Sequence, residues 1–173
     1  MKPSSEIRPV LKLQLNTTDY ALEAIAILGI ISLWVLAVVS YSSLPDSIST
    51  HFNISGQADD WGNKASVFIL PVIGILVFTG ISILSKFPHI FNYPVKVTEE
   101  NALQLYTKSV RIIRILKALV VILFLFIEWQ VCKSAEKAEI HAWFLPAVLI
   151  IPVLLPIVMA LLLTKTISSE KST

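Results

Sequence analysis

Four long apolar runs, separated by polar segments, dominate the chain. They cover residues 20–41, 66–84, 110–132 and 141–164. Each run has about the 20 predominantly apolar residues that a helix needs to cross the hydrocarbon core of a bilayer. The pattern therefore predicts an all-α integral membrane protein, in which four transmembrane helices form two helical hairpins.

The polar segments complete a single membrane domain. Residues 1–19 precede the first helix, residues 42–65 join the first two helices, and residues 165–173 form a short tail. A cleaved signal peptide is the rival interpretation of the first run. Its apolar core is long for a signal peptide, however, and no small-residue cleavage site follows it. We therefore expect residues 20–41 to remain as a transmembrane helix.

The distribution of lysine and arginine predicts the orientation, because short cytoplasmic loops are enriched in both residues. Eleven of the 14 fall on one side of the predicted membrane: Lys2, Arg8, Lys12, Lys86, Lys96, Lys108, Arg111, Arg114, Lys117, Lys165 and Lys171. The other side receives only Lys64, Lys133 and Lys137. We therefore expect a multi-pass protein of the cell (inner) membrane, with both termini in the cytoplasm.

The composition agrees with this class and excludes others. Only 15% of the residues are charged and the mean hydropathy is +0.75, whereas about a quarter of the residues are charged in soluble domains. A net charge of +2 provides no basic surface of the kind that binds nucleic acid. Cys132 is the single cysteine, which excludes an internal disulfide and a thiolate zinc cluster. We expect no cofactor.

The third helix is expected to extend beyond the bilayer. Thr98 is a suitable N-cap, and Glu99 and Glu100 suit the positive end of the helix dipole. A helix from there to Cys132 has about 34 residues and is roughly 51 Å long. Its first three turns should therefore lie in or below the cytoplasmic interface.

Four cations, Lys108, Arg111, Arg114 and Lys117, follow one another at every third position of this helix. The spacing resembles a voltage-sensing helix, but steps of three drift by about 60° around the axis, so we expect a spread over half the circumference and snorkelling to the interface. Lys117 is the deepest of the four, and Glu23 is a carboxylate at similar depth in the first helix. We hypothesise an intramembrane Glu23–Lys117 pair, with two independent snorkelling side chains as the alternative.

Proline residues interrupt the fourth apolar run. Pro146 lies near its start, whereas Pro152 and Pro156 lie in its interior. An interior proline removes a backbone donor and collides with the preceding turn. We therefore expect a bent fourth helix, with a structural kink favoured over a role in a transport pathway.

The loop of residues 42–65 contains most of the unusual polar residues. Pro45-Asp46 predicts a turn, and residues 48–54 are long enough for one extended segment. Gly56 and Gly62 allow positive φ angles at two further turns. We expect a compact, turn-rich loop on the outer side of the membrane.

A specific set of residues at fixed spacing marks this loop: Leu44-Pro45-Asp46, His51-Phe52-Asn53, Gly56, Asp59, Trp61-Gly62 and Lys64. The set resembles the signature of the bacterial SdpI-type immunity and signalling membrane proteins, whose shared N-terminal hairpin is a domain of unknown function. The resemblance covers about residues 36–116. It implies protection against a secreted peptide toxin, and a signal relayed through a repressor held at the membrane. The chain departs from the family in having four predicted spans where those proteins have more, and in carrying Ser49 where proline is usual.

The candidate ligand-binding residues are those polar and aromatic members of the loop: Asp46, His51, Asn53, Asp59, Trp61 and Lys64. In the structural alternative Asp46 caps a turn, His51 bonds to loop backbone, and Lys64 pairs with Asp59 or Asp60. Imidazole and carboxylates could instead hold a metal ion or act as a general base, although no histidine spacing typical of a metal site is present.

These observations predict a binding protein for an extracytoplasmic peptide or lipid-like ligand, acting in toxin resistance or sensing. Its expected partners are the lipid bilayer, an extracellular peptide and a cytoplasmic regulator. Two alternatives stay open. One is a membrane-embedded, metal-dependent enzyme centred on His51. The other is a small transporter that uses the prolines and the level of Glu23 and Lys117.

Overall fold

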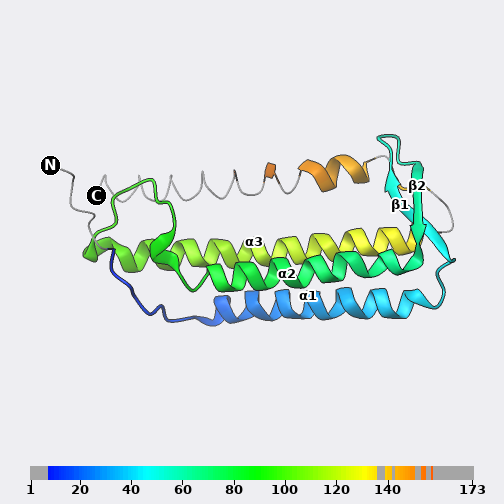
Figure 1. Cartoon of the computed structure of the whole chain (residues 1–173). Coiled ribbons are helices and arrows are strands. Elements are labelled where there is room, and N and C mark those ends of the chain that lie inside the picture. The colour runs from blue at the N-terminus through cyan, green and yellow to red at the C-terminus, as the bar shows by residue number, and fades with distance from the viewer. Residues whose placement is uncertain (1–7, 136–138, 142, 151–152, 155–156, 158–173) are drawn as a thin grey trace.

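Among the residues that the structure describes, three long helices lie side by side and a small β-hairpin stands at one end of them (Figure 1). The computed structural model describes residues 8–135, 139–141, 143–150, 153–154 and 157. The elements in chain order are α1 (Thr17–Tyr41), β1 (Ser47–Phe52), β2 (Ala58–Asn63), the 3-10 helix η1 (Lys64–Phe68), α2 (Ile69–Leu84), the 3-10 helix η2 (Pro88–Ile90) and α3 (Glu99–Ser134).

Two capping boxes define where α1 and α3 begin. The Asn16 side chain accepts a hydrogen bond from the backbone of Asp19, whose carboxylate accepts one from the backbone of Asn16. Thr98 and Asn101 exchange the same two bonds at the start of α3. Such reciprocal bonds satisfy amide donors that the first helical turn leaves without partners. The prediction that Thr98 caps the third helix is confirmed.

The first turns of α3 form a small apolar core beyond the ends of the other helices. Val97, Ala102, Leu105 and Tyr106 are buried there, and Leu11 and Leu13 of the N-terminal segment pack against them. With 36 residues, α3 is about 54 Å long, which agrees with the predicted extension.

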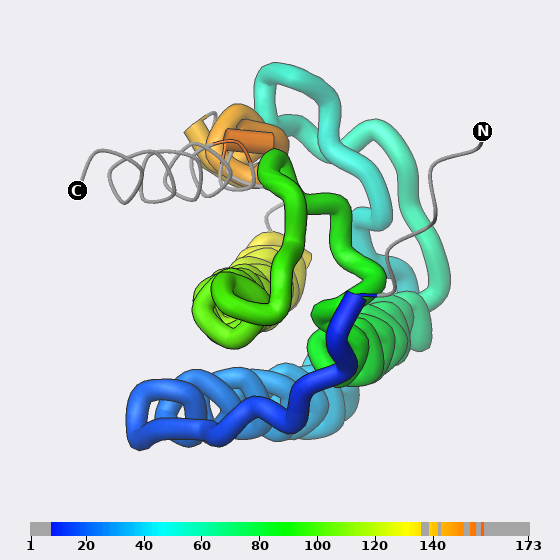
Figure 2. Tube along the Cα trace, turned by 90° about the vertical axis from the view of Figure 1, so that its left-hand side faces the viewer, coloured from blue at the N-terminus to red at the C-terminus, as the bar shows by residue number. Residues whose placement is uncertain are grey.

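The N-terminal segment crosses this end of the bundle in an extended conformation (Figure 2). The Arg8 guanidinium donates to the carbonyl oxygens of His89 at 3.1 Å and Phe91 at 2.6 Å. Tyr93 donates its hydroxyl proton to the Pro88 carbonyl at 3.0 Å, and burial raises the pKa of Tyr93, which keeps this donor protonated. Residues 8–16 are therefore part of the packed structure.

Small residues allow the helices to approach closely. A Cβ atom at Gly29 of α1 would lie 2.5 Å from Val121 Cγ1 of α3, and one at Gly74 of α2 would lie 2.9 Å from a methyl group of Leu33. Close backbone approach through small residues is a common way for helices to associate in membranes. Gly80, by contrast, has no atom within 4 Å of its Cβ position.

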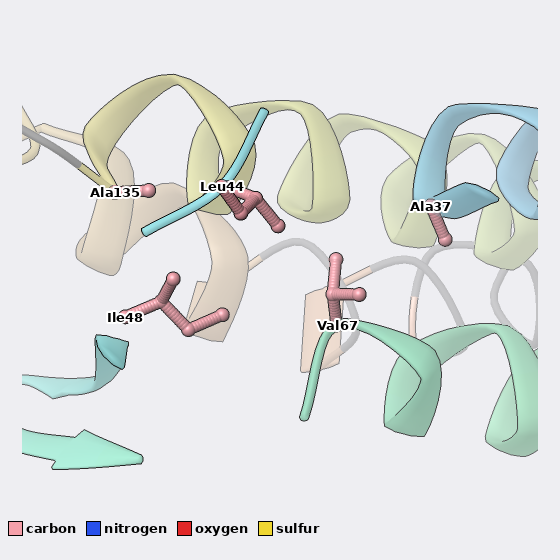
Figure 3. Packing of buried hydrophobic residues seen from close by; sticks show 5 residues of the cluster. All are labelled: Ala37, Leu44, Ile48, Val67 and Ala135. Atoms are coloured by element: carbon pink, nitrogen blue, oxygen red, sulfur yellow. The ribbon is translucent and has the colours of Figure 1, made fainter. Parts of the chain in front are cut away.

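A second apolar cluster joins the hairpin to the helix ends. It consists of Ala37, Leu44, Ile48, Val67 and Ala135, contributed by α1, the following turn, β1, η1 and the end of α3 (Figure 3). Because each element contributes one buried side chain, the hairpin is packed onto the bundle and does not extend freely from it.

The hairpin corrects the sequence-based expectation of an all-α chain with a turn-rich loop. Strands β1 and β2 are antiparallel, and Ile48 pairs with Gly62. Gly62 was predicted to form a turn but lies within β2, where its missing side chain leaves room for Thr50, whose Cγ2 would be 2.7 Å from a Cβ atom. β2 contains Asp59, Asp60 and Gly62, residue types that are depleted in strands, so composition concealed it.

Two helices in the described part of the chain are long and apolar enough to cross a membrane: Thr17–Tyr41, and the continuous segment Lys64–Leu84 of η1 and α2. A core helix of a soluble protein passes the same test but is mostly buried, whereas only 22% and 17% of their most apolar windows are buried here. Four transmembrane helices are thus not established by the structure. Of the fourth predicted span, residues 144–150 are helical, whereas Pro152 and Pro156 lie outside the described residues.

The close contact at Gly29 gives a testable prediction. Gly29→Ala should lower the free energy of unfolding by about 1–3 kcal/mol, because the added methyl group must displace the stiff Val121 side chain. The measurement is the unfolding midpoint of the purified protein in mild detergent titrated with sodium dodecyl sulfate. Gly80→Ala is the matched control and should be neutral or slightly stabilising, by up to about 1 kcal/mol. Equal effects of the two substitutions would contradict the packing.

Candidate functional site

A network of charged side chains joins α1 to α3 near the start of α1. Arg111 Nε lies 3.2 Å from one carboxylate oxygen of Asp19, and Arg114 Nη1 lies 3.4 Å from the same oxygen. The Asp19 and Arg114 side chains are both buried. Charges are removed from water only at a high cost unless they are paired, so this network holds the two helices at one relative position.

The structure brings Glu23 and Lys117 together in the same network. Lys117 Nζ lies 2.6 Å from Glu23 Oε2 and 2.9 Å from Ser82 Oγ of α2, and Arg114 Nε lies 3.1 Å from Glu23 Oε1. The Lys117 ammonium also lies 4.6 Å from the ring centroid of Phe78, within the range of a cation–π interaction. The Lys117 side chain therefore connects α3, to which it belongs, with both α1 and α2.

Sequence reasoning missed two members of this network, Asp19 and Ser82. Asp19 was assigned to the polar segment before the first helix, although α1 begins at Thr17. The signal that could have placed it in the helix is the Asn16-to-Asp19 spacing of the capping box. Arg111 and Arg114 were expected to snorkel, but they face the α1 carboxylates because Asp19 and Glu23 lie one helical turn apart.

In the hairpin, Lys64 does not pair with Asp59 or Asp60 as the structural alternative predicted. Its ammonium lies 2.9 Å from Asp46 Oδ1 and 5.2 Å from the ring centroid of Tyr41. The reason is the antiparallel register, which returns the end of β2 to the start of β1, so that Lys64 N also donates to the Asp46 carbonyl. Lys64 and Asp46 close the base of the hairpin.

The other candidate ligand-binding residues lie further along the hairpin. His51 Nδ1 is 2.5 Å from Asp59 Oδ1 across the two strands, so His51 contacts a carboxylate and not the loop backbone as expected. Asn53 accepts hydrogen bonds from the amides of Ser55 and Gln57 and so shapes the turn, while Trp61 is exposed on β2. His51 and Asp59 form a pair, whereas Asn53 and Trp61 do not join them, so the set does not form one convergent site.

The enzyme alternative depended on a metal site in this region. Within the described part of the chain, no group of three or more histidine, cysteine, aspartate or glutamate side chains is placed to hold a metal ion. The His51–Asp59 pair is exposed on the hairpin. A histidine and a carboxylate can relay a proton, but no nucleophile or third ligand accompanies them among these residues.

A pocket of about 720 Å³ lies between the end of α3 and the segment that follows it. Its aromatic lining comes from Phe126, Trp129 and Trp143, whose rings stack at centroid distances of 5.9 and 6.2 Å. Its polar lining includes Lys133, Glu139 and His141. None of these residues was among the candidate ligand-binding set. An aromatic wall with a few charged groups is typical of a site for an amphipathic ligand.

The tip of the hairpin forms part of the support of this pocket. Gly56 adopts a φ angle of +82°, and its carbonyl accepts a hydrogen bond of 2.8 Å from the Ile140 amide. Gln57 and Glu139 form an isolated antiparallel bridge beside it. The hairpin therefore holds residues 139–140, which line the pocket.

Glu128 is a further buried acid on α3, directly before Trp129 and one helical turn before Cys132. Its Oε1 atom makes no hydrogen bond to any described residue. No partner for this carboxyl group can be read from the sequence alone. A buried polar atom without a hydrogen-bond partner lowers the stability of the fold.

Comparison with known proteins finds a family of unknown function that matches part of the chain. Residues 28–75 match the model of a family described as "Domain of unknown function (DUF1648)", a stretch that extends from the middle of α1 through the hairpin into α2. A protein of Archaeoglobus fulgidus described as "Uncharacterized protein" is 24% identical over 172 residues, which cover 91% of this chain and 93% of that protein. No solved structure matches the chain.

The charged network predicts strong coupling between Glu23 and Lys117. In a double-mutant cycle with Glu23→Gln and Lys117→Met, Glu23→Gln should cost about 3–5 kcal/mol, because it leaves the buried Lys117 ammonium without a carboxylate. Lys117→Met should cost less, because Glu23 is partly exposed and keeps its ion pair with Arg114. The double variant should cost about 1–3 kcal/mol less than the sum of the two. Unfolding in detergent measures all four stabilities, with exposed Lys86→Met as a near-neutral control. Additive effects would contradict the pair.

A second prediction concerns the contact between the hairpin tip and Ile140. Gly56→Ala should detach this contact, because the new Cβ atom would lie 2.3 Å from the Ile140 carbonyl oxygen at a φ angle unsuited to alanine. Hydrogen–deuterium exchange should then show faster exchange of the Ile140 amide by roughly tenfold or more, which corresponds to about 1.4 kcal/mol. Ser55→Ala serves as the control in the same turn. Unchanged protection in Gly56→Ala would show that the contact is not maintained.

Proposed function

We propose that this chain is an SdpI-like polytopic membrane protein that binds an extracytoplasmic peptide or lipid-like ligand in toxin resistance or sensing. The pocket of about 720 Å³ beside the hairpin is the observation that carries the proposal. It combines aromatic and charged groups at the end of the bundle where the motif residues lie. The bacterial signature residues form the hairpin that supports it.

Placement in a membrane is supported by the apolar surface of the bundle. Large hydrophobic side chains are exposed around both apolar helices, in α1 at Tyr20, Ile25, Ile27, Leu28, Ile31, Val35, Val38 and Val39, and in α2 at Ile69, Val72, Ile73, Ile75, Leu76, Ile83 and Leu84. Soluble monomers rarely expose a continuous apolar surface of this extent. A lipid environment suits such helices better than water does.

The proposed orientation places the hairpin outside and the charged network toward the cytoplasm. Among the described lysine and arginine residues, only Lys64 and Lys133 lie at the hairpin end, in accord with the bias of cytoplasmic loops toward these residues. Tyr41, Trp61, Trp129 and Trp143 gather at the same end. Aromatic rings of this kind are enriched at the membrane interface.

The pocket has the chemistry that an amphipathic ligand requires. An apolar groove of about 430 Å³, lined by Leu36, Ile122 and Leu125, adjoins the pocket through Phe126 and Trp129. A ligand could place polar groups against Lys133 and Glu139 and an apolar part along this groove. The motif residues of the hairpin then act mainly by positioning, through the contact between Gly56 and Ile140.

The proposal is tested by measuring binding to the purified full chain in detergent. Isothermal titration calorimetry with a panel of secreted amphipathic peptides, and with dihexanoylphosphatidylcholine as a lipid-like probe, should identify at least one ligand. Trp129→Ala should weaken its binding by roughly thirtyfold, about 2 kcal/mol, because a central aromatic contact is lost. Trp143→Ala should act in the same direction.

Ile54→Ser is the matched control, because Ile54 is an exposed apolar residue of the hairpin that does not line the pocket. It should bind like the unmodified chain. Growth assays with the same peptides report the biological effect: cells expressing the chain should tolerate a bound peptide better than cells expressing Trp129→Ala. Absence of binding by every probe, or equal losses in Ile54→Ser and Trp129→Ala, would overturn the proposal.

A further inference from the structure

A second cavity, of about 430 Å³, lies at the opposite end of the bundle from the hairpin. The N-terminal segment, α1, the end of α2 and α3 meet around it. Its polar lining consists of Lys12, Glu23, Ser82, Ser85, Lys86 and Arg114. The cavity thus adjoins the charged network, and it is distinct from the ligand pocket described above.

The charges around this cavity do not balance. Within the network, the three cations Arg111, Arg114 and Lys117 face only two carboxylates, Asp19 and Glu23, which leaves a net charge of +1. A positive charge held in a region of low dielectric attracts an anion strongly. The network therefore has a place for one additional negative group.

Two further cations stand at the mouth of the cavity. Lys12 and Lys86 line it and are exposed, and neither forms an ion pair with a described residue. They come from segments far apart in the sequence, the extended N-terminus and the end of α2, yet they border the same space. Together with the network they bring the positive excess around the cavity to three charges.

Hydrogen-bond donors remain for an anion at the inner wall. Arg114 directs Nε to Glu23 and Nη1 to Asp19, and its Nη2 makes no hydrogen bond to a described residue. Ser82 accepts a bond from Lys117, which leaves its hydroxyl proton to donate. A guanidinium, a hydroxyl and two ammonium groups are the donors that bind phosphate oxygens.

We propose that this cavity binds the phosphate group of an anionic ligand, with a phospholipid headgroup as its occupant. The remaining wall supports a lipid rather than a free phosphate compound, because Leu11, Leu15 and Val110 give it an apolar side. Lysines at this level of a membrane protein attract anionic lipids of the cytoplasmic leaflet. A bound headgroup would complete the charge balance of the network and connect the N-terminal segment to α2.

The test uses the purified full chain in a nonionic detergent. Native mass spectrometry and thermal unfolding are recorded with dioleoylphosphatidylglycerol, with dioleoylphosphatidylcholine, and with glycerol 3-phosphate as the soluble headgroup. Phosphatidylglycerol should bind as one retained molecule and raise the unfolding temperature, and phosphatidylcholine should do so much less. If glycerol 3-phosphate alone stabilises the chain equally, the phosphate site stands and its ligand is a soluble compound.

Single substitutions test whether phosphatidylglycerol binds at this cavity. Lys12→Gln and Lys86→Gln should each weaken phosphatidylglycerol binding by roughly fivefold, and both should fold normally because both side chains are exposed. Lys133→Gln removes the same charge at the hairpin end and should have no effect. Binding of a peptide to the ligand pocket beside the hairpin should stay unchanged in Lys12→Gln and Lys86→Gln, so the two proposals fail separately. Equal binding of both lipids, or equal losses in Lys133→Gln and Lys86→Gln, would overturn the inference.

Discussion

The attachment of three α3 cations to two α1 carboxylates is the interaction on which the arrangement of the helices depends. Apolar contacts between helices are not directional, so by themselves they leave the relative position of two helices less well defined. A buried ion pair has no such freedom, because any displacement leaves a charge without its partner. The contact of Lys117 with Ser82 extends this constraint from α1 and α3 to α2.

The charged network also affects how the helices pack at the other end of the bundle. Once Glu23 lies against Lys117, the helical rise places Gly29 against Val121 and brings Ala37 into the same cluster as Ala135. The hairpin is packed onto that cluster through Leu44 and Ile48 (Figure 3). The pocket at the hairpin end, which residues 139–140 line and the hairpin tip supports, therefore depends on a polar network about 24 Å away, measured along α3 from Arg114 to Gln130.

The sequence predicted those features that a local pattern determines. Length and apolarity gave the helices, and Thr98 with the following acids gave the start of α3. The proximity of Glu23 and Lys117 could be hypothesised because intramembrane charges need partners.

Asp19 was missed because the predicted first helix began three residues after the observed start of α1. Strand β2 was not predicted because its pairing with β1, and not its own composition, stabilises it. The aromatic pocket joins α3 to a segment beyond it, and no local pattern reports such a contact.

The central claim is that the charged network and the hairpin stand on opposite sides of a membrane. Labelling of single cysteines in right-side-out spheroplasts tests it most directly, in a Cys132→Ser background with Ser55→Cys in the hairpin turn or Gln14→Cys in the N-terminal segment. Both positions are exposed. A membrane-impermeant maleimide should label Ser55→Cys in intact spheroplasts, and Gln14→Cys only after the membrane is permeabilised. Equal labelling of both positions before permeabilisation, or the reverse pattern, would contradict the account.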